Sequence, residues 1–189
     1  MNGYKAVERI VRAMRGDELI VSANGMISRE LFAVKDTPNN FYMLGSMGLA
    51  SSISLGIALA VPHRKVVVLD GDGNLLMNMG SLATVVRMYP ENLIHIVLDN
   101  ECYASTGGQP SASTVVGLER VAASCGFKLC RKIEDEEHLE ATIRELLAAD
   151  GPAFVLVKVE QSWKQVPRVA HSPESIMARF KRFVELSAK

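Results

Sequence analysis

The sequence has few cysteines and no long apolar run, and both features exclude classes of protein. Its three cysteines, Cys102, Cys125 and Cys130, show neither Cys-x-x-Cys nor Cys/His ligand spacing. This argues against a disulfide framework, a structural zinc site and an iron–sulfur cluster, and it indicates a reducing, cytoplasmic environment. No stretch approaches the roughly 18 uninterrupted apolar residues of a membrane span, and the first residues lack a signal-peptide core. We therefore expect a soluble protein with no membrane partner.

An excess of either charge is also missing. The 21 Lys and Arg residues equal the 21 Asp and Glu residues in number, and the basic residues form no stripe, so nothing indicates a nucleic-acid partner. At 189 residues and 48% apolar composition, the chain is long enough for one α/β domain with a full core and short for two. We expect a single domain over residues 1–189, without repeats or interdomain linkers.

Helix and strand patterns alternate along the chain. Helical spacing of apolar residues predicts helices at 7–14, 49–61, 80–88, 118–124, 136–149 and 173–186, the last two with Asp135 and Ser172 as N-caps. Short apolar runs predict strands at 19–21, 41–43, 66–69, 93–98, 127–130 and 154–159. This alternation predicts an α/β fold with a doubly wound, mainly parallel sheet and helices on both faces.

The most informative segment is Asp-Gly-Asp-Gly at residues 70–73, which ends the apolar run 65–69. Asn100 likewise follows the apolar run 93–98. Both runs are typical of buried parallel strands. The carboxyl ends of such strands form the ligand-binding edge of an open α/β sheet, so we expect the two polar segments to meet there.

The chemistry of these residues fits a divalent cation with a diphosphate. A carboxylate from Asp72 and an amide oxygen from Asn100, together with diphosphate oxygens, are the ligands that Mg²⁺ prefers. Gly71 and Gly73 let the backbone approach phosphate closely. The alternative is that this Gly-Asp-Gly is only a strand-to-helix turn.

A third segment, residues 21–32, is typical of a strand end followed by a glycine turn and a helix that begins near Ser28. Helix N-termini attract anions, so Asn24, Gly25 and Ser28 are candidates for holding a terminal phosphate from the side opposite the metal. Alternatively, Ser28 is only a helix cap, with Arg29 and Glu30 solvated.

The spacing from Gly-Asp-Gly to Asn100 resembles the cofactor signature of the thiamine diphosphate enzymes. The family usually has Asn-Asn where this chain has Asp99-Asn100, and the resemblance assigns the metal ligand to the second position. It also implies that the main-chain carbonyl of Cys102 is the third protein ligand of Mg²⁺. The amides of Gly73 and Asn74 are then expected near the phosphates.

A second motif, Gly45-Ser46-Met47-Gly48, precedes the small-residue helical stretch 51–60. Thiamine enzymes hold the cofactor bent, with a large apolar side chain between its two rings and a main-chain carbonyl just upstream. By resemblance Met47 is this wedge, Gly45 supplies the carbonyl, and Ser46 contacts the cofactor between them. The alternative is that Met47 fills an irregular gap in the core.

Residues 101–111 predict a loop above the proposed metal that closes over substrate, or alternatively a plain surface connection. Its Gly-Gly-Gln-Pro stretch resembles the phosphonopyruvate and sulfopyruvate decarboxylases, and the resemblance runs from about residue 22 to 159. Tyr103 is then a candidate cofactor contact and Gln109 a candidate catalytic residue. Ser105 and Thr106 are candidate contacts of the substrate's anionic group.

The chain has no candidate for the Glu that activates the cofactor in thiamine diphosphate enzymes. The family uses a Glu on a separate pyrimidine-binding domain to activate the cofactor, and Glu101 and Glu119 read instead as loop and helix-surface residues. The resemblance therefore implies that this chain is a β subunit and that an α subunit carries the pyrimidine-binding domain and the activating Glu. An isolated β chain is expected to expose an apolar face near Met47 and Asn100, with self-association as one consequence.

The reaction implied is decarboxylation of a small anionic 2-oxo acid, with sulfopyruvate favoured for a split enzyme and phosphonopyruvate second. Another 2-oxo acid, a thiamine-dependent oxidoreductase subunit and a non-catalytic α/β nucleotide-binding or interaction module are the alternatives. His63 and His95 read as structural. Arg168 and His171 are weaker ligand candidates, because their segment leads into the last helix.

Overall fold

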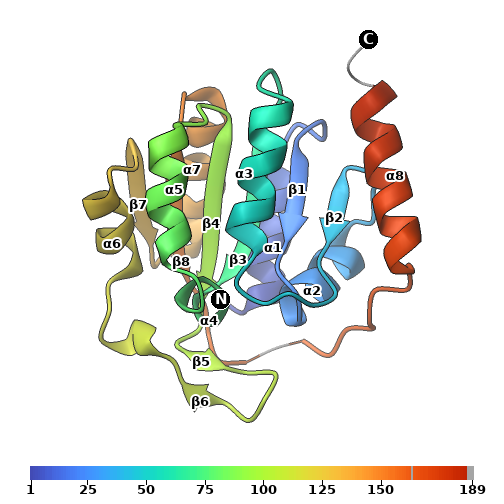
Figure 1. Ribbon diagram of the computed structural model, residues 1–189. Coiled ribbons are helices and arrows are strands. Elements are labelled where there is room, and N and C mark those ends of the chain that lie inside the picture. Colours follow the sequence, from blue (N-terminus) through green and yellow to red (C-terminus); the bar gives the residue numbers. More distant parts are fainter. Residues whose placement is uncertain (163, 187–189) are drawn as a thin grey trace.

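The computed structural model describes residues 1–162 and 164–186, and its centre is a six-stranded sheet (Figure 1). The strand order is β2-β1-β3-β4-β8-β7, and each pairing is parallel. The strands are β1 (Leu19–Ser22), β2 (Asn40–Tyr42), β3 (Val66–Gly71), β4 (Leu93–Asp99), β7 (Leu129–Ile133) and β8 (Ala153–Lys158).

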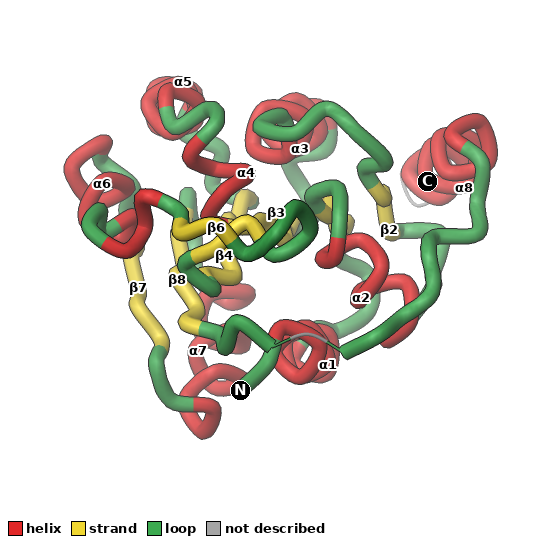
Figure 2. Tube along the Cα trace, turned by 90° about the horizontal axis from the view of Figure 1, so that it is seen from below, coloured by secondary structure: helices red, strands yellow, loops and turns green. Residues whose placement is uncertain are grey.

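Helices cover both faces of this sheet, as Figure 2 shows from its carboxyl edge. One face carries α1 (Gly3–Ala13), α2 (Met26–Val34) and α7 (Glu136–Ala148), and the other carries α3 (Ala50–Ala60), α5 (Gly80–Met88) and α6 (Leu118–Cys125). The last helix, α8 (Pro173–Leu186), packs beside β2. The predicted doubly wound α/β fold is therefore confirmed. Within the described ranges, no helix combines the length and the apolar character needed to cross a membrane.

The two cores are built from alternate residues of the same strands. In β3, Val67 and Leu69 join the core under α1, α2 and α7, whereas Val66 and Val68 join the core under α3, α5 and α6. Because successive side chains of a strand point to opposite faces and both faces are covered, a central strand must be apolar along its length. This explains why β3 and β4 read as continuous apolar runs in the sequence.

The sequence prediction is wrong at several connections. The strand predicted at 127–130 is β7, which runs from Leu129 to Ile133. Phe127 lies before it, because its amide closes the end of α6 on Ala122 and its ring packs against Phe154. The sequence does not predict four short elements: α4 (Asp72–Leu76), the antiparallel pair β5 (Cys102–Tyr103) and β6 (Gln109–Pro110), and the 3-10 turn η1 (Ala112–Thr114).

The C-terminal helix is confirmed, with the Ser172 side chain accepting a hydrogen bond in its first turn. Phe180 of α8 packs edge-on against Phe41 of β2, with ring centroids 5.5 Å apart. His171 lies 2.8 Å from a carboxylate oxygen of Asp36, so it fastens the start of α8 to the rest of the domain. These contacts fit a structural role for His171 in the segment that leads into the last helix.

Glu30 is buried between α1 and α2. It is 3% exposed, and its carboxylate oxygens lie 3.0 and 3.2 Å from the position that a Cβ on Gly3 would take. Burial raises the pKa of the Glu30 carboxyl to about 7. The alternative in which Glu30 is solvated is therefore wrong.

We expect Glu30 to make the folded state less stable as the pH rises. The native chain keeps a proton on Glu30 between about pH 4.5 and 7 that the unfolded chain releases. The free energy of unfolding then falls by at most about 1.4 kcal/mol per pH unit from this group. Glu30→Gln should remove that contribution in urea unfolding across the window. Glu137→Gln, at an exposed position of α7, is the control, and equal pH slopes in Glu30→Gln and wild type would contradict the prediction.

Candidate functional site

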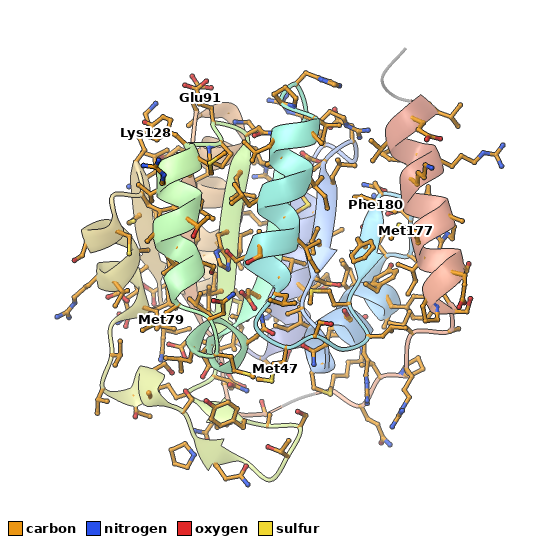
Figure 3. All side chains as sticks on the ribbon, in the orientation of Figure 1. Met47, Met79, Glu91, Lys128, Met177 and Phe180 are labelled. Carbon is orange, nitrogen blue, oxygen red and sulfur yellow. The ribbon has the colours of Figure 1, made fainter. Side chains whose placement is uncertain are left out.

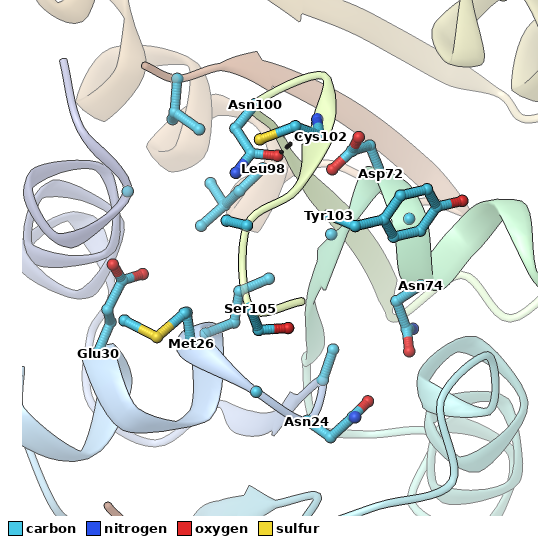
Figure 4. Close-up of a pocket in the computed structure, with 18 of the residues that line it drawn as sticks. Asn24, Met26, Glu30, Asp72, Asn74, Leu98, Asn100, Cys102, Tyr103 and Ser105 are labelled. Atoms are coloured by element: carbon cyan, nitrogen blue, oxygen red, sulfur yellow. Dashed lines mark hydrogen bonds between the residues drawn. The ribbon is translucent and has the colours of Figure 1, made fainter. Parts of the chain in front are cut away.

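A cavity opens at the carboxyl edge of the sheet, where the sequence predicts the metal and diphosphate site. Its lining comes from the ends of β1, β3 and β4, the start of α4 and the β5 segment (Figure 4). Of the residues predicted from the sequence, the cavity is lined by Asn24, Gly25, Met47, Gly71, Asp72, Gly73, Asn74, Asn100, Cys102, Tyr103 and Ser105. Segments up to about 80 residues apart in the chain thus meet because parallel strands end at a common edge.

Asp72 begins α4 directly after β3 and is held by two serines. Its Oδ2 accepts hydrogen bonds from Ser111 and, at 3.2 Å, from Ser113. Burial raises the pKa of the Asp72 carboxyl, and the Ser111 hydrogen bond opposes that shift. The two hydroxyls occupy one carboxylate oxygen and fix the orientation of the other.

Asn100 and Cys102 form a tight turn after β4. The Asn100 Oδ1 accepts from the Cys102 amide at 3.2 Å (Figure 4). The Cys102 partner in the β5–β6 pair is Pro110, which has no N–H to donate to the Cys102 carbonyl. The amide oxygen and the main-chain carbonyl predicted as ligands therefore come from one short segment beside Asp72.

A second layer of charge lies behind this segment. Asp99 is buried, and its carboxylate accepts from Lys158 at 2.9 Å and from Ser113 at 2.7 Å. Lys158 also pairs with Glu101, which accounts for Glu101 without a role in activating a cofactor. Ser113 thus bridges Asp99 and Asp72. Neither Ser113 nor Lys158 carries a local sequence signal, because only the tertiary structure brings the η1 turn and the end of β8 beside Asp99.

Asn24 and Gly25 lie across the cavity from Asp72, at the start of α2. The Asn24 Oδ1 is buried and has no hydrogen-bond partner among the described residues. Gly25 has φ +89°, and no atom lies within 4 Å of the position its Cβ would take. This side of the cavity therefore has open space for a ligand, and the Asn24 oxygen is free to accept a hydrogen bond from a donor.

Ser28 does not belong to this wall of the cavity. The helix begins at Met26 rather than near Ser28, with Gly25 at its N-cap. The Ser28 hydroxyl is buried and lies 2.9 Å from the Ala23 carbonyl and 3.2 Å from the Met43 carbonyl. It joins the ends of β1 and β2 to α2, so both sequence interpretations of Ser28, as phosphate contact and as cap, are at odds with its contacts.

The loop between β2 and α3, residues 43–49, is called the Met47 loop, and Met47 lies at the same edge of the sheet (Figure 3). Met47 lines the cavity and is 38% exposed, so the core-filler interpretation does not hold. Gly45 and Ser46 line instead a neighbouring apolar cavity against α8. Leu44, Leu49 and Met77 are also exposed, and they give this region the apolar surface expected of an isolated chain.

The segment 101–111 combines a pocket-lining part and an exposed part. The Tyr103 ring covers Gly73, with a ring atom 2.5 Å from the position of a Cβ there. Gln109 is exposed on β6 and does not line the cavity. Its side chain makes hydrogen bonds with Thr106. Glu30, which the sequence analysis did not nominate, lines the cavity beside Gly3.

Comparisons with known proteins agree with this arrangement. The family model described as "Thiamine pyrophosphate enzyme, C-terminal TPP binding domain" matches residues 21–157. The chain is 46% identical to the sulfopyruvate decarboxylase subunit beta of Methanothermobacter thermautotrophicus, over 93% of this chain and 91% of the relative. It is 42% identical to the phosphonopyruvate decarboxylase of Streptomyces viridochromogenes, over 95% of this chain but only 45% of that protein.

A solved structure gives the same fold. The benzoylformate decarboxylase of Polynucleobacter necessarius superposes with a TM-score of 0.72 at 19% identity, covering 88% of this chain and 34% of that one. The match of the family model runs from within β1 to within β8 and includes the ends of β1, β3 and β4, which line the cavity. The chain belongs to the thiamine pyrophosphate enzymes and corresponds to their C-terminal TPP binding domain.

Proposed function

We propose that this chain binds thiamine diphosphate through Mg²⁺ at the carboxyl edge of the sheet. The observation that carries the proposal is the convergence of Asp72, Asn100 and Cys102 on one cavity. They offer a carboxylate, an amide oxygen and a main-chain carbonyl, and hard cations such as Mg²⁺ favour oxygen ligands. Ser111 and Ser113 hold Asp72 so that one oxygen stays available for the metal.

The diphosphate is proposed to lie between the start of α4 and the start of α2. The amides of Gly73 and Asn74 are in the first turn of α4, where unpaired N–H groups favour anions. Gly71 brings the backbone close, and Asn24 and Gly25 form the opposite wall. The open space beside Gly25 supports this assignment, and the Asn24 side chain carries an NH₂ group that can donate to a phosphate oxygen.

The organic rings are proposed to rest on the Met47 loop. Met47 is the apolar wedge, the Gly45 carbonyl accepts from the cofactor's amino group, and Ser46 and Tyr103 add contacts. The bound cofactor supplies an electron sink for loss of CO₂ from a 2-oxo acid. Gln109 is proposed to reach the reacting groups only after β5 and β6 close over substrate.

The substrate is proposed to be sulfopyruvate, with release of sulfoacetaldehyde and CO₂, as in coenzyme M biosynthesis. The relatives named as sulfopyruvate decarboxylase beta subunits support this, since the chain covers 91% and 88% of two of them. Phosphonopyruvate is the second candidate, because two phosphonopyruvate decarboxylases are 42% and 40% identical to this chain. The chain spans only 45% and 44% of those two proteins.

A separate α subunit is proposed to complete the site, carrying the pyrimidine-binding domain and the activating Glu. The beta-subunit names of the relatives and the exposed apolar residues around Met47 support a hetero-oligomer. We place the complex in the cytoplasm, where its free cysteines would remain reduced.

The test is calorimetric titration of thiamine diphosphate with Mg²⁺ into this chain co-purified with a candidate α subunit, together with CO₂ release from sulfopyruvate and phosphonopyruvate. Binding plus turnover of sulfopyruvate supports the whole proposal. Turnover of phosphonopyruvate alone would make phosphonopyruvate the substrate in place of sulfopyruvate. If thiamine diphosphate bound neither to this chain nor to the complex, the cofactor assignment would be refuted.

Asp72→Asn should abolish most cofactor binding while the fold is kept. The variant keeps the shape of the side chain but removes the charge that Mg²⁺ requires. Since outer-shell changes at metal sites typically cost about 10–100-fold, loss of a direct ligand should weaken binding by at least about 100-fold. Calorimetry measures this, with Asp135→Asn at the exposed start of α7 as the control. Unchanged affinity in Asp72→Asn would exclude Asp72 as a ligand.

Gly73→Ala should weaken cofactor binding with little effect on stability. The added methyl group lies in the first turn of a helix, where Ala is well tolerated. It would meet the Tyr103 ring at 2.5 Å, so the ring must shift into the cavity. Gly73→Ala combined with Tyr103→Ala should recover part of the affinity. Wild-type affinity in the single variant would show that the phosphates do not approach this turn.

A further inference from the structure

The backbone of Gly48, next to Met47, is held by two asparagines. The Gly48 amide donates to Asn74 Oδ1 at 2.7 Å, and the Gly48 carbonyl accepts from Asn78 Nδ2 at 3.1 Å. Asn74 lies in α4, and Asn78 follows the C-cap of that helix, Met77. The two peptide groups that flank the Gly48 Cα are therefore both fixed by a single short segment.

The close approach of the Gly48 backbone to Met77 and Asn78 explains why residue 48 is glycine. Gly48 has φ +93°, and a Cβ there would lie 3.2 Å from the Met77 Cβ and 3.4 Å from the Asn78 Cβ. A side chain would be strained and crowded at the same time. The Met47 loop is thus seated directly on α4 and the turn behind it.

A buried pair on the central strands sets the orientation of the Asn74 amide. Asn74 Nδ2 donates to Asp70 Oδ1, which also accepts from the Gly71 amide at 2.8 Å. The other oxygen of Asp70 lies 2.9 Å from His95 Nε2. Since a carboxylate only accepts hydrogen bonds, Asn74 must turn its NH₂ group to Asp70 and its oxygen to Gly48.

The contacts from His95 through Asp70 to Asn74 are shielded from water. His95 is 0% exposed, Asp70 1% and Asn74 6%. In such surroundings an unmade hydrogen bond is costly, so the amide orientation is well determined. The unit joins the strand end that carries the Gly71 to Gly73 turn to the loop that carries Met47.

We propose that Asp70, Asn74, Asn78 and His95 form a clamp on the backbone of Gly48 that positions Met47 against the cofactor's rings. This inference rests on the proposed function, because it takes Met47 as the ring contact. Asp70, Asn78 and His95 are positioning residues, since they act through Gly48. The clamp also makes the diphosphate turn and the ring-binding loop move as one body.

The experiment separates the two halves of the cofactor in the α–β complex. Inorganic diphosphate with Mg²⁺ probes the phosphate site alone, whereas thiamine diphosphate with Mg²⁺ probes the rings as well. Asn78→Ala and Asn78→Asp remove the donor to the Gly48 carbonyl without touching the cavity lining. The matched control is Ser81→Ala, because the buried Ser81 hydroxyl has no hydrogen-bond partner among the described residues.

We expect both Asn78 variants to bind inorganic diphosphate as wild type does. Their affinity for thiamine diphosphate should fall about 5-fold in Asn78→Ala, the scale of one hydrogen bond, and further in Asn78→Asp, which faces a carboxylate to a carbonyl. The kcat should fall with little change in KM for the 2-oxo acid. His95→Phe should show the same pattern, and His95→Gln, which keeps a donor for Asp70, should restore it.

Two results would overturn the clamp. One is wild-type thiamine diphosphate affinity and kcat in both Asn78 variants. The other is an equal loss of inorganic diphosphate and thiamine diphosphate affinity, which would indicate general damage to α4. If the wild-type complex binds inorganic diphosphate but gains nothing from the thiamine rings, the proposed function fails first, and the clamp fails with it.

Discussion

The pairing of β3 with β4 is the constraint on which the site depends. Their parallel register sets Asp70 opposite Val97 and Gly71 opposite Leu98. The residues that follow each strand must therefore emerge side by side at one edge of the sheet. Asp72 begins α4 there, and Asn100 begins the turn into β5. Any slip in this register would separate the carboxylate from the amide oxygen, and the apolar residues of both strands, packed in two cores, oppose such a slip.

Buried polar contacts then refine what the register brings together. The serines of the 3-10 turn hold Asp72, Lys158 neutralises Asp99 behind them, and His95 lies against Asp70 inside the sheet. Each group is costly to bury alone and is stabilised by its partners. The site is thus supported by side chains that do not line the cavity, and it is rigid where the proposed metal and phosphates would lie.

The Met47 loop differs from this rigid part because its outer surface is apolar and exposed. Leu44 and Leu49 of the loop are exposed, and so is Met77 at the C-cap of α4. A domain of this kind covers about a third of the benzoylformate decarboxylase chain, so relatives of this fold provide further protein beyond it. An exposed apolar surface beside this cavity supports the proposal that the site is shared between subunits.

The sequence was sufficient for the fold class, the order of most elements and the positions of Asp72, Asn100 and Met47. Long apolar runs, glycine turns and caps are local signals. The number of residues between two strand ends can also be read directly from the sequence. The sequence was not sufficient for the bounds of β7, or for α4 and the β5–β6 pair, where burial of Phe127 and the packing of Tyr103 on Gly73 decide the backbone.

The tertiary structure alone decided which polar groups share a neighbourhood. Glu30 read as solvated and is buried, Ser28 read as a phosphate contact and is sealed between strand ends, and Ser113 and Lys158 carried no local signal. The reason is physical: a side chain's partners depend on strand order and helix packing, and residues 40 or more positions apart acquire them only when the sheet forms. The sequence by itself determined what ligand chemistry this edge offers, and only the fold decided which residues support it.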